Sequence, residues 1–341
     1  MAEAGQISRI DPAVGIAGGE VLIECEDFDT SDPTTCAVWF GEQPASIVAL
    51  APRRILAVIP ELKHAGEVEV RVQSRDVQSA PATVTIGRIL AEDLHPVANP
   101  AVDPDDGSVL VTRSGSRGEK LPVSLFRIER DGEVKEFSGD ITNPTGIAFD
   151  REGQMFVTSR ADGIVYRITP FKEGVPFAKN LGIATGIAFD GTGTMFVGDR
   201  TGTIYRVSGI GEEKSWAELE PSVSAYHLAF GPESALYVTG PSVTSSDSIF
   251  RIDPDGEVKT FYKGLGRPQG LAFDEQGNLY VAASLRGRRG IVRFPPDGAG
   301  PEMFLAGMNL VGLAFGQAGE LIVASIDAVH LVPVGIKGTL L

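Results

Sequence analysis

The stretch "PTGIAFDREGQMFVTSRADGIVYRI", residues 144–168, recurs along the chain and decides the fold of its larger part. Four further copies are "ATGIAFDGTGTMFVGDRTGTIYRV" from Ala184, "AYHLAFGPESALYVTG" from Ala225, "PQGLAFDEQGNLYVAAS" from Pro268 and "LVGLAFGQAGELIVAS" from Leu310. A weaker first copy, "NPAVDPDDGSVLVTR", begins at Asn99. Repeats of roughly 40 residues are typical of β-propeller blades, each a four-stranded sheet. Six copies therefore predict a six-bladed β-propeller over residues 87–341.

Each part of the repeat has a structural interpretation. The small and apolar run Gly146–Phe149 fits an inner strand beside a narrow channel, and Asp150 to Gly153 fits a tight turn. A second apolar strand follows at Met155–Thr158. The third strand carries an arginine in five of the six copies, which indicates framework pairing between blades rather than one active site. These arginines are Arg127, Arg167, Arg206, Arg251 and Arg293.

The last copy lacks a fourth strand, because only residues 333–341 follow its third strand. Residues 86–94, "IGRILAEDL", look like the outer strands "VPFAKNL" and "KTFYKGL" of other copies. We therefore expect the segment that leads into the propeller to supply the outermost strand of blade six. Such a strand would close the ring and protect its edge.

Residues 6–86 read as a separate all-β domain. About seven short apolar segments, separated by turn residues, predict an immunoglobulin-like sandwich. The stretches "IDPAVGIAGGEVLIECEDF", "VWFGEQPASIV", "ILAVIP" and "GEVEVRV" resemble the IPT/TIG domain. Such domains serve as spacers, packing partners and interaction modules. The two cysteines of the chain, Cys25 and Cys36, fit either a short-loop disulfide or two buried, reduced side chains.

Composition narrows the possible partners and compartments. The formal net charge of −15 disfavours binding to nucleic acid or to an anionic lipid surface. We found no apolar stretch of the length that a membrane helix requires. The first eight residues show no leader pattern, which favours a cytoplasmic location, whereas a trimmed chain would allow an extracellular one.

The repeated segment resembles NHL-type propellers and, more distantly, the senescence-marker/gluconolactonase family. The latter resemblance implies a divalent cation at one mouth of the channel, held by a glutamate and by asparagines, one of them just before an inner strand. At that place this chain has Thr145, Thr185, Tyr226, Gln269 and Val311. None is an asparagine or a carboxylate, so we expect no metal site and no cofactor.

One group of side chains suits acid–base chemistry. His227 replaces a repeat glycine on an inner strand, next to Tyr226, and Asp199 ends a second strand one blade earlier. Together they are candidate catalytic residues. The alternative is a histidine that fills space in an irregular blade.

The loops that join second to third strands are rich in cationic residues. Because arginine clusters bind carboxylate and phosphate, they predict an anion site at the channel mouth, unless the charges are merely solvated. These loops contain eight cationic and four acidic residues. The acidic residues are Glu119, Asp162, Asp199 and Asp247, and the cationic residues are Arg113, Arg117, Lys120, Arg160, Arg200, Arg286, Arg288 and Arg289. Our candidate ligand-binding residues are Arg113, Arg160, Arg200, Arg286 and Arg288, with Thr145, Thr185 and Gln269.

Three functions remain open from the sequence. We favour a non-enzymatic propeller that binds a small anionic ligand or an acidic protein segment. The alternatives are a gluconolactonase-like hydrolase or lyase that uses Asp199, His227 and Tyr226, and a self-assembling homo-oligomer formed through exposed strand edges.

Overall fold

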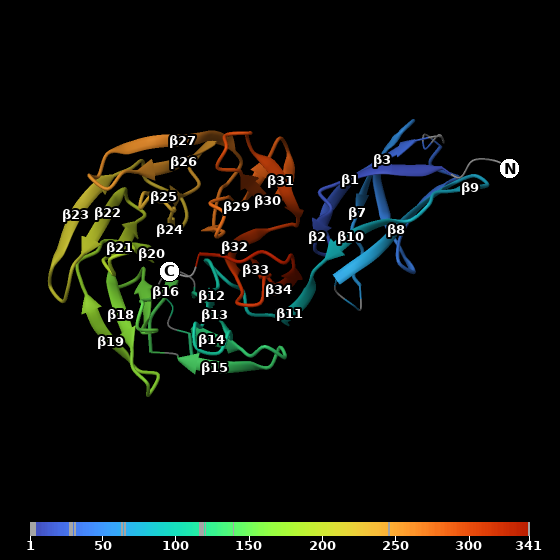
Figure 1. The fold of residues 1–341 in the computed structure, drawn as a ribbon. Helices are drawn as coiled ribbons and strands as arrows, with labels where there is room; N and C mark the ends of the chain where they lie inside the picture. Colours follow the sequence, from blue (N-terminus) through green and yellow to red (C-terminus); the bar gives the residue numbers. More distant parts are fainter. Residues whose placement is uncertain are drawn as a thin grey trace.

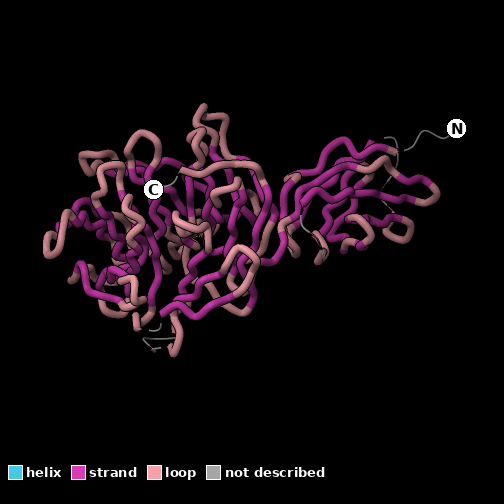
Figure 2. Tube along the Cα trace, turned by 60° about the horizontal axis from the view of Figure 1, so that its bottom comes forward, coloured by secondary structure: helices cyan, strands magenta, loops and turns pink. Residues whose placement is uncertain are grey.

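The computed structural model describes residues 5–26, 30, 32–62, 64, 66–115, 119, 121–138, 140–244 and 246–339. These residues form a ring of blades with a smaller sandwich beside it (Figure 1). Throughout the described parts the regular structure is β-strand (Figure 2), and no helix there is long and apolar enough to cross a membrane.

The N-terminal domain packs two sheets face to face. Alternate residues of its strands are buried, as in Val21, Ile23 and Cys25. The first sheet has the order β1 (Gln6–Asp11), β3 (Glu20–Glu26), β7 (Arg54–Val58), β6 (Ser46–Ala51). The second contains β2 (Val14–Gly15), β10 (Ala82–Ile86), β8 (Gly66–Ser74), β4 (Cys36–Phe40) and β5 (Gln43–Pro44), and β9 (Val77–Gln78) pairs with β8.

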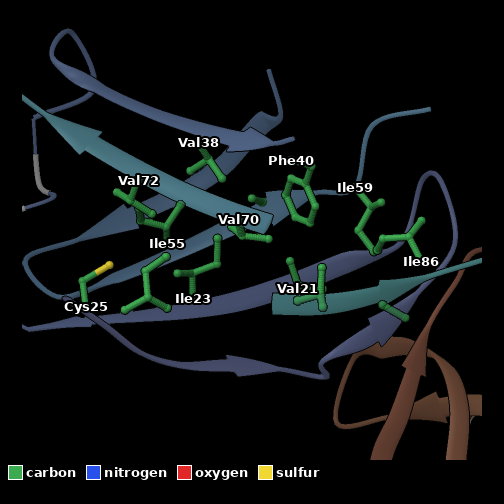
Figure 3. Close-up of a cluster of buried hydrophobic side chains, with 14 of the residues drawn as sticks. Val21, Ile23, Cys25, Val38, Phe40, Ile55, Ile59, Val70, Val72 and Ile86 are labelled. Atoms are coloured by element: carbon green, nitrogen blue, oxygen red, sulfur yellow. The ribbon is translucent and has the colours of Figure 1, made fainter. Parts of the chain in front are cut away.

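Aliphatic side chains from both sheets fill the space between them, with Phe40 as the largest (Figure 3). Cys25 and Cys36 belong to this core and are buried, unbonded thiols. Burial and the neighbouring Cys36 raise the pKa of Cys25 to about 12. Both cysteines therefore serve as small apolar core residues.

In the described residues the propeller has six four-stranded blades around a channel, as the repeat predicted, and the strands of blade five are part of a larger sheet (Figure 1). Blades one to three are β12 (Ala101–Val102), β13 (Val109–Thr112), β14 (Leu125–Ile128), β15 (Val134–Ser138); β16 (Pro144–Phe149), β17 (Met155–Ser159), β18 (Ile164–Ile168), β19 (Gly174–Ala178); and β20 (Ala184–Phe189), β21 (Met195–Asp199), β22 (Thr203–Val207), β23 (Glu213–Glu218).

Blades four and five are β24 (His227–Phe230), β25 (Leu236–Thr239), β26 (Asp247–Ile252), β27 (Val258–Leu265); and β28 (Leu271–Phe273), β29 (Leu279–Leu285), β30 (Arg288–Phe294), β31 (Glu302–Ala306). Blade six is β32 (Leu310–Phe315), β33 (Glu320–Ser325), β34 (Ala328–Pro333) and β11 (Arg88–Glu92).

The turn after each inner strand forms for the reason expected from its sequence. In blade two, a side-chain oxygen of Asp150 accepts the backbone N–H groups of Glu152 and Gln154 at 3.1 and 2.8 Å. Gly153 has a φ of 75°, which a glycine adopts without strain. Aromatic rings then join neighbouring blades, as between Phe156 and Phe189 at 5.4 Å.

The ring closes as predicted. β11 lies antiparallel to β34, with Arg88 opposite Leu331, and so forms the outer strand of blade six. β11 begins two residues after β10 ends, so the N-terminal domain is tied directly to the closing strand.

The two domains share one sheet. β2 pairs in parallel with β31, where Gly15 lies opposite Ala306, and Ile16 N–H donates to the Ala306 carbonyl at 3.0 Å. The resulting ten-stranded sheet runs from blade five into the N-terminal domain. Ile16 is 2% exposed and packs between blades five and six, while Ala306 is buried in the N-terminal core. The junction is therefore an interlocked core rather than a loose linker.

The third-strand arginines act differently from our expectation. Arg127 pairs with Asp103 at 3.1 Å and also with Asp106, both within blade one. Arg251 and Arg293 likewise find their carboxylates within their own blades. The prediction of pairing between blades is therefore wrong for these three: the arginines tie strands and turns within a blade.

Candidate functional site

The channel has two chemically different ends. Because neighbouring strands in a blade are antiparallel, loops into the inner strands and loops between second and third strands share one face. We call this the loop end. The turns after the inner strands, such as residues 150–153, share the other face, which we call the turn end.

The polar residues predicted at the start of the inner strands join neighbouring blades. Thr185 accepts the Tyr226 backbone N–H at 3.1 Å and donates to the Gly198 carbonyl at 3.0 Å. The Gln269 amide donates to the Leu310 carbonyl at 3.3 Å. Thr145 holds the equivalent position in blade two, but its hydroxyl is buried with no hydrogen-bond partner among the described residues. Of the three side chains, Thr145 is therefore the one with unused hydrogen-bonding capacity.

Two of the three candidate catalytic residues, Asp199 and Tyr226, bond to other groups. Asp199 accepts the Ile183 and Thr201 N–H groups and the Thr201 hydroxyl, so its carboxylate holds a loop. The Tyr226 hydroxyl donates to the Glu220 carbonyl, and burial, followed by the charge of Asp199, raises the pKa of Tyr226. Tyr226 and Asp199 are thus neighbours without forming a shared proton relay.

His227 is 3% exposed, and burial lowers its pKa to about 4. Its Nε2 atom is buried with no hydrogen-bond partner in the described part of the chain. The ring is therefore neutral near pH 7, and it occupies a position where other blades have glycine. This arrangement fits a side chain that fills space between blades, and it leaves one imidazole nitrogen unused.

Three of the predicted arginines form an arc at the loop end. Arg113, Arg160 and Arg200 each follow the second strand of blades one, two and three, respectively. We call these three residues the basic arc. Burial, followed by the charge of Arg200, lowers the pKa of Arg160, so these two guanidinium groups influence each other. None of the three has a carboxylate within ion-pair distance among the described residues, unlike Arg127, Arg251 and Arg293.

Two buried oxygens beside the basic arc have unused hydrogen-bonding capacity. The backbone carbonyl of Asn143 accepts the Arg160 N–H at 3.2 Å, but its side-chain Oδ1 is buried without a partner from the described residues. The Thr145 hydroxyl, two residues away, is in the same state. Buried polar atoms are usually satisfied, so these two mark a place where a polar molecule or water would bind.

The other predicted ligand-binding arginines, Arg286 and Arg288, stand at the loop end of blade five, outside the basic arc. Arg288 donates to a carboxylate oxygen and to the backbone carbonyl of Asp11 and thereby holds the N-terminal domain. Arg286 is exposed at the tip of the same long hairpin, β29–β30. Arg117 and Lys120 lie outside the described residues.

Two carboxylates at the loop end are already engaged. Asp199 and Asp247 are occupied by backbone and hydroxyl donors, since Asp247 accepts from Ser242 and Arg267. Within the described ranges, the acidic side chains close enough to share an ion are those in the exposed β26–β27 turn. That turn lies away from the loop end, and there Arg251 and Lys259 already neutralise Asp253.

The sequence reasoning missed a cavity at the turn end. It has a volume of about 400 Å³ and is lined by the apolar-Ala-Phe triplet that ends five inner strands. The triplets are residues 147–149, 187–189, 228–230, 271–273 and 313–315. The repetition of this triplet was the available signal, but it was assigned only to strand packing.

Comparison with known proteins identifies the smaller domain. The family model of the IPT/TIG domain matches residues 6–86. The N-terminal sandwich is an IPT/TIG domain. No curated protein matches the chain.

Many solved structures share the architecture. An auxiliary nutrient binding protein from Bacteroides thetaiotaomicron is 14% identical, with a TM-score of 0.54, over 96% of this chain and 97% of its own. A gluconolactonase from Xanthomonas campestris is 15% identical, with a TM-score of 0.57, over 72% and 88%. A virginiamycin B lyase from Staphylococcus aureus, solved with quinupristin, is 15% identical, with a TM-score of 0.53, over 92% and 99%. At these identities the likeness is one of fold, and it supports the propeller beside the IPT/TIG domain.

Proposed function

We propose that the protein is a binding protein that takes an anionic ligand at the loop end of its channel. The observation that carries the proposal is the basic arc, whose three arginines follow the second strands of three successive blades and form no ion pair with a described carboxylate. Arg160 also donates to the Gly115 carbonyl at 3.1 Å, and the charge of Arg200 contributes to the lowered pKa of Arg160. Like charges held together favour an anion between them, because a carboxylate or phosphate relieves their repulsion and forms charge-assisted hydrogen bonds.

The ligand we favour is a small carboxylate or phosphate that also carries hydroxyl groups. The anion would meet the guanidinium groups, while a hydroxyl could donate to the unpartnered Asn143 Oδ1 or bond to the Thr145 hydroxyl. An acidic protein segment is the alternative occupant, since it offers several carboxylates but no such hydroxyl. The IPT/TIG domain supports the propeller through their shared sheet and leaves the loop end of blades one to three to the ligand.

Calorimetric titration tests the proposal with citrate, inorganic phosphate and a hexaglutamate peptide. We expect saturable binding of citrate or phosphate that weakens as salt is added. The double variant Arg160→Gln/Arg200→Gln should lose at least ten-fold in affinity. The matched control Arg167→Gln/Arg206→Gln removes the same two charges from exposed third-strand positions and should stay within two-fold.

Absence of binding by all three probes, or equal losses in the arc variant and in the control Arg167→Gln/Arg206→Gln, would contradict the proposal. Tight binding of the peptide with no binding of citrate or phosphate would favour the acidic segment.

A hydrolase or lyase acting on lactones or esters is the second candidate function. It is supported by the gluconolactonase and the lyase among the similar structures and by the neutral, unpartnered Nε2 of His227. A panel of lactones and esters, assayed with and without a chelator, tests it. Turnover that disappears in His227→Gln would support it, and no turnover above that of this variant would contradict it.

A further inference from the structure

The cavity at the turn end differs in chemistry from the site proposed above. Its wall is built from the apolar-Ala-Phe triplets of blades two to six, with residues 99–102 from blade one. Two charged side chains, Asp150 and Arg151, are part of its lining, both from the turn of blade two. The volume of about 400 Å³ lies within the range of small-molecule sites.

The polar side chains around this cavity are already bonded, except that of Arg151, which is exposed in the turn of blade two. Asp150 holds its own turn through two backbone N–H groups. Asn99 donates to the Leu271 carbonyl and accepts the Leu313 N–H, both at 3.2 Å. Thr339, from the segment after β34, donates to the Phe273 carbonyl at 3.3 Å. Apart from the exposed Arg151, the lining side chains therefore offer a ligand no free charged group.

Backbone amides supply the remaining polarity. Each inner strand is the edge of its blade, so those of its N–H and C=O groups that do not pair with the second strand face the channel. They offer a few uncharged hydrogen-bond partners. The apolar part of the cavity surface exceeds the polar part, and an apolar molecule would displace water from that apolar part.

Closely packed residues separate the cavity from the loop end. We call them the tier, and they are Asn99, Gly270, Gly312 and His227. The backbone of Asn99 lies against Gly312 and its side chain against Gly270, where an added Cβ would come within 1.9 Å of Asn99 Oδ1. His227 is buried at the equivalent place in blade four. The residues that line the cavity include none of Thr145, Thr185, Tyr226, His227 or Gln269 within the described chain.

We propose that the turn-end cavity is a second ligand site, which binds an uncharged, predominantly apolar small molecule such as an aromatic ring system. The ligand would lie among the Phe and Ala side chains of the repeated triplet and bond, if at all, to backbone amides of the inner strands. The site is independent of the basic arc and of the anion proposed there.

Fluorescence titration of the full chain with N-phenyl-1-naphthylamine, an uncharged apolar probe, tests this inference. We expect one saturable site per chain, with enhanced probe emission. Ala229→Leu adds three carbons at the cavity wall and should raise the Kd at least ten-fold. Ala161→Leu makes the same change in an exposed turn at the loop end and should stay within two-fold.

Phe230→Ala provides a second readout if Ala229→Leu fails to fold, because it enlarges the cavity rather than filling it. We expect its Kd to change at least five-fold and the emission of the bound probe to shift to the red. The double variant Arg160→Gln/Arg200→Gln should bind the probe within two-fold of the wild type, whether or not the anion proposal holds.

The inference is overturned if the wild type shows no saturable binding, or if the Kd is unchanged in every folded cavity variant. It is also overturned if the double arginine variant abolishes probe binding, since the probe would then lie at the loop end.

Discussion

The two ends of the propeller channel are formed by the same inner strands, but the residues at the turn end are nearly the same in five blades, whereas those at the loop end differ from blade to blade. At the turn end, five blades end their inner strands in the same apolar-Ala-Phe triplet, and the result is one apolar cavity. At the loop end, the equivalent positions are Thr145, Thr185, Tyr226, Gln269 and Val311, and three of six blades add an arginine of the basic arc. Residues that repeat in every blade therefore determine the propeller fold, whereas residues that vary between blades determine the chemistry of the loop end.

The largest expected effect comes from breaking the tier that separates the two ends. In Gly270→Ala, the new Cβ would lie 2.5 Å from the Gly312 Cα and would displace the Asn99 side chain. Overpacking and the loss of the Asn99 hydrogen bonds should lower the free energy of unfolding by about 3 kcal/mol. Urea denaturation measures this change.

Gly191→Ala is the control, since its Cβ would meet only the Arg151 guanidinium, at 3.7 Å. We expect it to change the free energy of unfolding by no more than about 0.5 kcal/mol. Similar effects of the two substitutions would mean that the tier is not tightly packed.

A smaller effect, which depends on pH, should come from His227, which stands in this same tier. Its pKa is about 4 in the folded chain against 6.5 as the reference value, so the unfolded state takes up a proton first as the pH falls. The stability contributed by neutral His227 is therefore lost between about pH 6.5 and pH 4. From pH 7 to pH 5, the wild type should lose roughly 2 kcal/mol more than His227→Gln.

Urea denaturation of both proteins at the two pH values provides the measurement. His330, whose pKa burial also lowers to about 4, is present in both proteins and cancels in the difference. Parallel losses in wild type and variant would show that His227 is accessible to protons in the folded chain.

The smallest expected effect is a difference in unfolding free energy between replacing Arg127 at the turn end and replacing Arg200 at the loop end. Arg127 serves the turn end, where Asp103 and Asp106 bind it and its side chain is 19% exposed. Arg127→Gln leaves these carboxylates without their partner and should cost about 1 to 2 kcal/mol of unfolding free energy. Arg200→Gln should change it by less than about 0.5 kcal/mol, because no described carboxylate pairs with Arg200. Equal costs in urea denaturation would remove the distinction between framework and ligand arginines.

Much of the fold could be predicted because local patterns carry it. The repeat located the inner strands and turns, and the likeness of residues 86–94 to other outer strands located β11. The pairing of β2 with β31 could not be predicted, since a two-residue strand has no pattern of its own. It depends on a close approach, in which a Cβ at Gly19 would lie 2.5 Å from the Ala306 carbonyl.

The candidate site was harder to predict for a related reason. The sequence indicated which residues stand at the loop end, but not whether their polar groups are free. Thr185 and Gln269 bond to neighbouring blades, and Arg288 is held by Asp11 from 277 positions away. Such contacts arise from the tertiary arrangement of distant segments, which a pattern of residue types does not encode. The basic arc forms no ion pair among the described residues, although Arg160 also donates to the Gly115 carbonyl at 3.1 Å.

The closing strand also sets the order in which the chain is completed during synthesis. β11 leaves the ribosome directly after the IPT/TIG domain, but its partner β34 follows only when nearly the whole propeller has been translated. At about 5 to 20 residues per second, β11 waits on the order of ten seconds or more. Until then β11 has no partner, and β2 lacks β31, which is also translated late, so ring closure and the joining of the two domains are among the last events of maturation.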